Sequence, residues 1–249
     1  MLRRIKNLRE PLLSFSPSSQ SSDHDGSALI GLALPQALIA ARVKVWAAAI
    51  FLVVVPVFFQ APLVRSLPWL SLGMTGAWLL AGRYLSARPA TRLWGDLITG
   101  FSWTWLAGSL YWGWLRAEPL WHLPVEALGF PIVVTLLAQG RSRVGGYFFL
   151  GSLLVTAVTE IYIYWSDLLP MWRQVMITDP DWVPVVLRQA ATSLQTSVSF
   201  SRGILIALGL LTVGILPLQS KQLCWWAFSG AVLSTLIVDL LFWGSAFCF

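Results

Sequence analysis

Residues 45–63 read VWAAAIFLVVVPVFFQAPL and contain no Asp, Glu, Lys or Arg. The stretch is close to the roughly 20 apolar residues that an α-helix needs to cross a bilayer. Backbone groups in lipid must find their hydrogen-bond partners within the protein, so a continuous apolar run favours a helix. The alternating pattern of a membrane β-strand is absent from it. These residues therefore predict a transmembrane helix.

The whole chain has the same character. Of its 249 residues, 57% are apolar and 11% are charged, whereas a soluble domain carries about 25% charged residues. The net charge of +6 would suit nucleic acid in a soluble protein, but the cations here lie between apolar runs, where they set topology. We therefore expect no nucleic-acid partner. The expected fold is an all-α, polytopic integral membrane helix bundle whose main partner is the lipid bilayer.

Further apolar runs predict about seven transmembrane helices in residues 45–249, or six if the weakest run does not cross. The weakest is 123–140, because Pro124, Glu126 and Pro131 interrupt it. The predicted spans are 45–63, 66–82, 93–115, 123–140, 144–165, 203–218 and 223 to the C-terminus.

The segment 1–44 is predicted to be a flexible cytoplasmic N-terminal tail. Residues 28–41 within it are apolar but short and contain Pro35, which indicates an interfacial segment. With the N-terminus in the cytoplasm, twelve of the 17 Lys and Arg lie on the cytoplasmic side, as the positive-inside rule requires. The five on the opposite side are Arg65, Arg116, Arg173, Arg188 and Arg202.

A long connection separates the fifth and sixth predicted spans. Within it, Val183, Leu187, Leu194 and Val198 recur at roughly helical spacing. This predicts an amphipathic surface helix at about 183–200, which lies on the membrane or docks a partner.

Ionisable residues inside predicted spans are the first candidates for a functional site, because placing them in lipid costs several kcal/mol. Glu160 belongs to a polar stripe on one helix face, which must contact other helices or water. Such a stripe suits a proton or ion path, a ligand pocket or interhelical hydrogen bonds. Its members are Ser152, Thr156, Glu160, Tyr164 and Asp167.

Three other acidic residues occur in the predicted spans. Asp239 is the deepest, midway along the last one. Asp96 follows Arg92 by four residues, which favours an interfacial ion pair. His122 and Glu126 have metal-ligand spacing, but two ligands are incomplete and Pro124 lies between them, so we expect a hydrogen bond and no metal site.

The third predicted span is rich in aromatic residues. Trp103 and Trp105 are too deep for an interfacial aromatic belt, and Gly100 and Gly108 lie on the same helix. Flat rings beside small residues suit either close helix packing or contact with a ring-shaped ligand such as chlorophyll, carotenoid or quinone. No cofactor follows with certainty from this pattern.

Several stretches resemble a cyanobacterial family of multi-pass membrane proteins, a domain of unknown function. The resemblance covers roughly half of the chain and implies a plasma or thylakoid membrane, but it transfers no site residues. The segments that carry it are VPVFFQAPLVRSLPWLSL (55–72), LWGDLITGFSWTWLAGSLYWGWLRAEPLWHLPVEALGFP (93–131) and YFFLGSLLVTAVTEIYIYWSDLLPMWRQVM (147–176).

The sequence contains no GxSxG, HExxH, P-loop or dinucleotide-binding motif, so we do not expect an enzyme. The leading hypothesis is a non-catalytic accessory or assembly factor of a photosynthetic-membrane complex, with other membrane-protein subunits as partners. The alternative is a small-solute or ion transporter that uses Glu160 and Asp239.

Overall fold

The computed structural model describes residues 24–194 and 196–248, and within these ranges every regular element is a helix. The expected all-α class is therefore confirmed. The chain divides into two units, Met1–Ile39 and Ala40–Phe249. Most of the predicted flexible tail, residues 1–23, lies outside the described residues. The first helix, α1 (His24–Ser66), begins well before the predicted start at Val45.

Five helical segments are long and apolar enough to cross a membrane within the described part of the chain. The expected count of seven is not confirmed, because α2 (Pro68–Ser86) and α3 (Arg92–Leu110) do not belong to this group. Both helices have lengths near that of a span, but they are rich in Gly, Ser, Thr and Trp. The five segments are Leu38–Ser66, Pro119–Ala138, Arg143–Trp165, Val198–Gln219 and Leu223–Leu241.

The segment predicted to be the weakest span is a broken helix. It consists of the 3₁₀ turn η2 (Pro119–Trp121), α4 (His122–Glu126), the 3₁₀ turn η3 (Ala127–Gly129) and α5 (Phe130–Ala138). Proline lies in the first turn of η2 and of α5, where its missing N–H is tolerated. The predicted interruption is therefore present.

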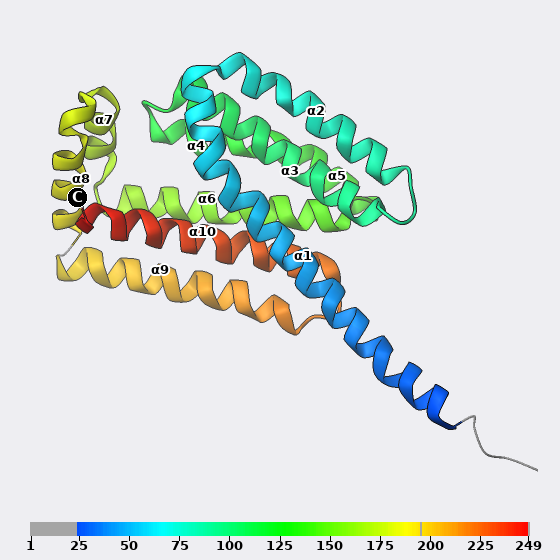
Figure 1. Ribbon diagram of the computed structural model, residues 1–249. Helices are drawn as coiled ribbons and strands as arrows, with labels where there is room; N and C mark the ends of the chain where they lie inside the picture. The colour runs from blue at the N-terminus through cyan, green and yellow to red at the C-terminus, as the bar shows by residue number, and fades with distance from the viewer. Residues whose placement is uncertain (1–23, 195, 249) are drawn as a thin grey trace, which may run out of the picture. The chain divides into compact units, whose positions relative to one another are not determined.

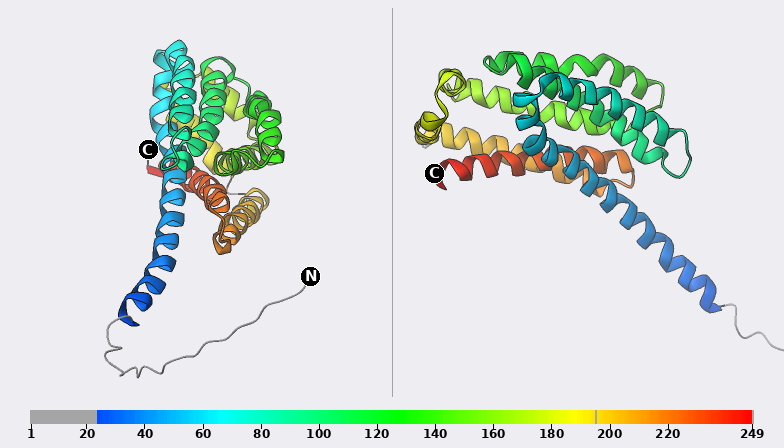
Figure 2. Two further views of the ribbon diagram at one scale, coloured as in Figure 1. Left: turned by 90° about the vertical axis from the view of Figure 1, so that its right-hand side faces the viewer. Right: turned by 45° about the horizontal axis from the view of Figure 1, so that its top comes forward.

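Within the second unit, α3 packs between α2 and α6 (Arg143–Trp165), while α10 (Leu223–Cys248) packs between α6 and α9 (Ser197–Ile215) (Figure 1). Two short helices, α7 (Leu169–Ile177) and α8 (Val183–Ser193), lie together at one end of these longer helices, and Figure 2 shows them there in a second orientation. The turn between α2 and α3 and the turn between α5 and α6 lie at the opposite end of the longer helices.

The predicted surface helix at 183–200 is two elements. Helix α8 ends at Ser193, and α9 begins at Ser197, where the Thr196 side chain accepts a hydrogen bond from the Ser199 N–H. This N-cap explains the break, because a Thr at this position satisfies a free N–H of the new helix. Helix α7 is not among the predicted elements.

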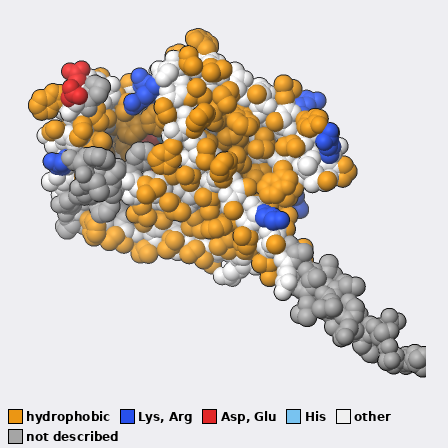
Figure 3. Space-filling view, viewed as in Figure 1, with side chains coloured by type: hydrophobic (Ala, Val, Ile, Leu, Met, Phe, Trp, Pro, Cys, Tyr) orange, Lys and Arg blue, Asp and Glu red, His pale blue; other side chains and the backbone are white. Residues whose placement is uncertain are grey.

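Side chains from α1, α3, α6 and α10 form the main apolar core. Its buried members include Val45, Phe101, Trp105, Phe148 and Ala231. The surface is also largely apolar: Figure 3 shows hydrophobic side chains over most of the visible face, with charged ones towards its ends. Such a surface suits lipid as the solvent.

Helices α3 and α6 approach each other at a pair of glycines. A Cβ atom added to Gly145 would lie 2.0 Å from the Asp96 carbonyl oxygen, and one added to Gly100 would lie 2.1 Å from the Gly145 carbonyl oxygen. The Asp96 carboxylate accepts hydrogen bonds from Ser142 Oγ at 2.5 Å and from the Val144 N–H at 2.9 Å. The expected Arg92 pairing is therefore replaced by a contact that holds the start of α6.

The close approach predicts that Gly145→Val destabilises the protein by roughly 3 kcal/mol, because the new side chain overlaps the α3 backbone. Thermal unfolding of the detergent-solubilised protein measures this loss. Gly76→Val is the matched control, since a Cβ atom at Gly76 meets nothing within 4 Å. Equal melting temperatures for the two variants would contradict the proposed packing.

Candidate functional site

Helices α4 and α6 face each other with polar side chains. His122 Nδ1 lies 3.0 Å from Glu160 Oε1, and Ser152 Oγ donates to Glu126 Oε1 at 3.4 Å. His122 and Glu126 are one turn apart on α4, while Ser152 and Glu160 are two turns apart on α6, so each pair shares a helix face. We call these four residues together with Tyr111 the α4–α6 seam.

The deepest members of the seam have few partners. Glu126 is 6% exposed, and its contact with Ser152 is its only hydrogen bond to another residue in the described part of the chain. Tyr111 is 0% exposed, and its hydroxyl has no hydrogen-bond partner among the described residues. Because buried polar atoms are almost always paired, the Tyr111 hydroxyl is the exception within the seam.

Aromatic rings surround the histidine. The Tyr111 ring stacks on the His122 ring with centroids 4.1 Å apart and an interplanar angle of 14°. Trp112 meets the same histidine ring edge-on at 6.3 Å. Tyr111 and Trp112 belong to a π-helical turn, η1 (Tyr111–Leu115), which follows α3 directly. Such turns are frequent at functional sites, since they redirect side chains within a helix.

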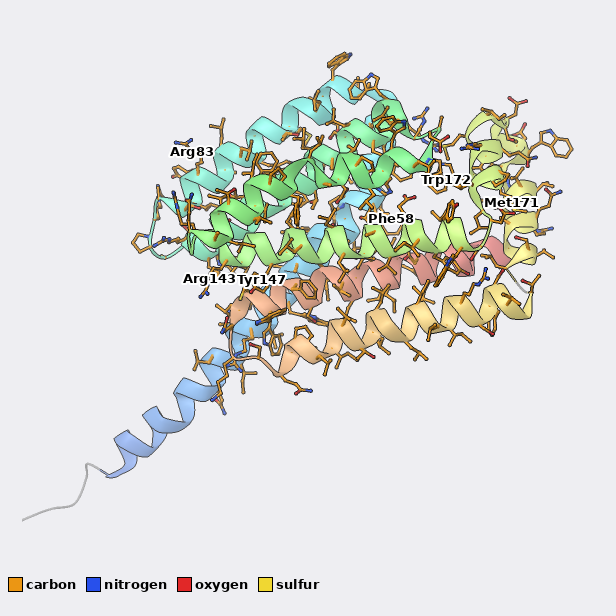
Figure 4. All side chains as sticks on the ribbon, turned by 180° about the vertical axis from the view of Figure 1, so that it is seen from behind. Phe58, Arg83, Arg143, Tyr147, Met171 and Trp172 are labelled. Atoms are coloured by element: carbon orange, nitrogen blue, oxygen red, sulfur yellow. The ribbon has the colours of Figure 1, made fainter. Side chains whose placement is uncertain are left out.

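Helix α7 is tied to the turn beside the seam. Trp172 Nε1 donates to the Arg116 carbonyl oxygen at 2.9 Å, and Arg173 pairs with Glu118 at 2.8 Å. Figure 4 shows Met171 and Trp172 at one end of the second unit and Arg83 and Arg143 at the other. The seam therefore lies towards the end of the unit that is opposite Arg83 and Arg143.

Only part of the predicted polar stripe reaches the seam. Ser152 and Glu160 contact α4, whereas Thr156 donates to the Ser152 carbonyl oxygen of its own helix at 3.2 Å. Tyr164 is 68% exposed, and Asp167 follows the end of α6. Asp239 is exposed on α10 and is not a member of the seam.

The predicted ring-ligand face is occupied by protein contacts. Trp105 is buried, donates from Nε1 to the Ser71 carbonyl oxygen at 2.9 Å and packs edge-on against Trp78 and Phe101. A Cβ atom on Gly108 would meet the Gln60 side chain at 2.9 Å, Gly100 abuts α6, and Trp103 lies against Gly129. Close helix packing, one of the two interpretations of this face, therefore accounts for these contacts.

A second buried polar cluster, centred on Gln60, is not among the sites predicted from the sequence. Gln60 Nε2 donates to the Trp105 carbonyl oxygen at 2.8 Å and to Ser109 Oγ at 2.9 Å, and Ser109 Oγ lies 2.8 Å from Ser71 Oγ. These bonds join α1, α2 and α3. The available signal was Gln60 itself, an amide in an otherwise apolar run.

The seam combines one imidazole, two carboxyl groups and two hydroxyls, all of which can donate or accept hydrogen bonds. His122 and Glu160 are partly accessible, with side-chain exposures of 24% and 12%. Among the described residues, no group of three His, Cys, Asp or Glu side chains could hold a metal ion.

The helices and the seam define an all-α membrane protein with ionisable residues between its spans. Residues 49–247 match a family described as "Protein of unknown function (DUF3120)", and the chain belongs to this family. The match includes the last helix, which lay outside the resembling segments. No curated protein and no solved structure matches the chain.

If the His122–Glu160 contact contributes to folding, removing both side chains should cost less than the sum of the two single losses. We predict a coupling of about 0.6 to 1.7 kcal/mol in a double-mutant cycle of His122→Ala and Glu160→Ala, the range of hydrogen bonds between membrane helices. Unfolding in detergent measures it. A control cycle of His122→Ala with Tyr164→Ala should show none, and a zero value for the Glu160 cycle would contradict the contact.

Proposed function

We propose that this protein is a non-catalytic accessory or assembly factor of a membrane-protein complex. The observation that carries the proposal is Asp239. It lies within a candidate membrane span and is exposed, and it makes no hydrogen bond or ion pair within the described part of the chain. A carboxyl group against lipid is unfavourable, so intramembrane acids usually face protein or water.

The neighbours of Asp239 are consistent with a covered face. Ile237, Leu240 and Leu241 are exposed large apolar residues on the same stretch of α10. An acid among large apolar side chains suits a helix of another subunit, which offers a polar partner for the carboxyl group and apolar contacts around it. Lipid alone would offer the apolar contacts but no polar partner for the carboxyl group.

We also propose the membrane in which the protein lies and the side that its N-terminus faces. The resemblance described above supports a cyanobacterial origin and hence a plasma or thylakoid membrane. Arg83 and Arg143 lie at one end of the second unit (Figure 4), and Arg88 and Arg141 are close to them in the sequence. This excess of cations supports a cytoplasmic position for that end and for the N-terminus. The lack of known catalytic motifs supports a non-enzymatic function.

This proposal predicts that the protein migrates with other membrane subunits in mild detergent, and that Asp239→Leu weakens the association roughly tenfold, the effect of about 1.4 kcal/mol. Native gel electrophoresis followed by immunodetection measures the bound fraction. Leu205→Ala on α9 is the control, because Leu205 is also exposed on a candidate span and its change should leave the complex intact.

A wild-type protein that migrates alone would contradict the proposal, provided that its deletion also leaves the photosystem and electron-transport complexes unchanged. An equal effect of Asp239→Leu and Leu205→Ala would remove Asp239 as the docking residue.

A small-solute or ion transporter is the second candidate, and the observation that favours it is the seam, where a His–Glu pair adjoins buried Glu126. A transporter would lose flux about tenfold or more in Glu160→Gln and in Asp239→Asn, because each carboxyl group would carry the ion or proton. Flux into proteoliposomes under a pH gradient measures this, with Tyr164→Phe as the control. Flux that both changes leave intact would count against the transporter.

A further inference from the structure

Basic side chains are concentrated around the turn between α2 and α3 and the turn between α5 and α6. Residues 83–96 and 139–147 contain one acidic residue, Asp96, whose carboxylate already accepts two hydrogen bonds within the protein. Figure 3 shows Lys and Arg side chains at this end of the visible face. Exposed arginines without an ion pair in the described part of the chain are Arg83, Arg88, Arg92, Arg141 and Arg143.

The two turns are joined through the first turns of α3. Ser142 and Val144, where α6 begins, donate hydrogen bonds to the Asp96 carboxylate. Helix α3 also meets the end of α2 at backbone distance, because a Cβ atom added to Gly95 would lie 2.4 Å from the Ser86 nitrogen. The five arginines therefore belong to one surface, which we call the basic surface.

The α2 part of the basic surface combines a positioned cation with exposed apolar side chains. The Arg88 guanidinium lies over the Tyr84 ring, 4.4 Å from its centroid, and donates a hydrogen bond to the Tyr84 hydroxyl. Leu80 is 70% exposed and Tyr84 is 58% exposed. Leu80 lies three residues before Arg83 and four before Tyr84, so all three share one side of the helix.

A lipid with an anionic head group matches both parts of this arrangement. Guanidinium groups hold phosphate oxygens through two parallel N–H donors, and an acyl chain covers an apolar side chain such as Leu80. A soluble anion would contact the arginines but would leave Leu80 exposed. A zwitterionic head group carries its own cation, which five arginines beside a single carboxylate would repel.

We propose that the basic surface binds anionic membrane lipids, with a head-group phosphate at Arg83 and Arg88 and an acyl chain against Leu80. Each Lys or Arg beside a membrane attracts anionic head groups by roughly fivefold in affinity. The basic surface includes neither Asp239 nor any residue of the seam, so this proposal does not depend on the proposed accessory function.

The test is lipid binding by the full-length protein in mild detergent, measured by native mass spectrometry. Phosphatidylglycerol and phosphatidylcholine with the same acyl chains are the probes. Wild type should bind phosphatidylglycerol about tenfold more tightly, and Arg83→Gln should weaken this binding about fivefold. Arg65→Gln is the matched control, because Arg65 is an exposed arginine in the last turn of α1 and lies outside the basic surface.

A second variant tests the acyl-chain contact. Leu80→Gln should weaken phosphatidylglycerol binding roughly threefold, because less apolar area is covered, and should leave binding of the soluble probe glycerol 3-phosphate unchanged. Leu208→Gln, on the exposed face of α9, is its control. All four changes are at exposed side chains, so melting temperatures without added lipid should match wild type.

Three results would each overturn the proposal. The first is equal affinity of wild type for the two lipids, and the second is an equal effect of Arg83→Gln and Arg65→Gln. The third is complete displacement of phosphatidylglycerol by an equal concentration of glycerol 3-phosphate, which would assign the basic surface to a soluble anion.

Discussion

The contact between α3 and α6 is the constraint on which the rest of the second unit depends. Gly100 and Gly145 allow the two backbones to meet, and a Cβ atom at either position would overlap the opposing chain. Asp96 then fixes the start of α6 by accepting hydrogen bonds from Ser142 and from the Val144 N–H. With no water to hydrogen-bond in lipid, such internal contacts decide how membrane helices associate. They also determine which face of α6 turns towards α4.

That orientation produces the seam. Glu160 meets His122, and Ser152 meets Glu126, because α6 presents both side chains to the broken helix. Two 3₁₀ turns, one on either side of α4, replace a regular helix. An apolar groove lies between this broken helix and α6. Polar and apolar features are thereby adjacent at one place in the unit, whereas Asp239 belongs to a different face.

The sequence could predict the elements but not their partners. Apolar runs depend on local composition, and so the helices α6, α9 and α10 lie near their expected ranges, as does the interruption of 123–140. Pairings depend on distant residues: His122 was matched to Glu126 four positions away, while its partner Glu160 is 38 positions away. The glycine and tryptophan face of α3 likewise suits either helix packing or a ring-shaped ligand until its neighbours are known. The role of Gln60 could not be predicted either, because a neutral amide in an apolar run makes its hydrogen bonds to Trp105 and Ser109, which are 45 and 49 positions away.

The broken helix Pro119–Ala138 is long and apolar enough to cross the bilayer, and a crossing places its two flanking turns on opposite sides. Single cysteines at Ala117 and Gln139, both exposed, test this directly in a background of Cys224→Ala and Cys248→Ala. The reagent is a membrane-impermeant maleimide applied to sealed vesicles of one orientation. If the helix crosses the bilayer, one position is labelled in sealed vesicles and the other only after permeabilisation. Labelling of both positions, or of neither, before permeabilisation would contradict it.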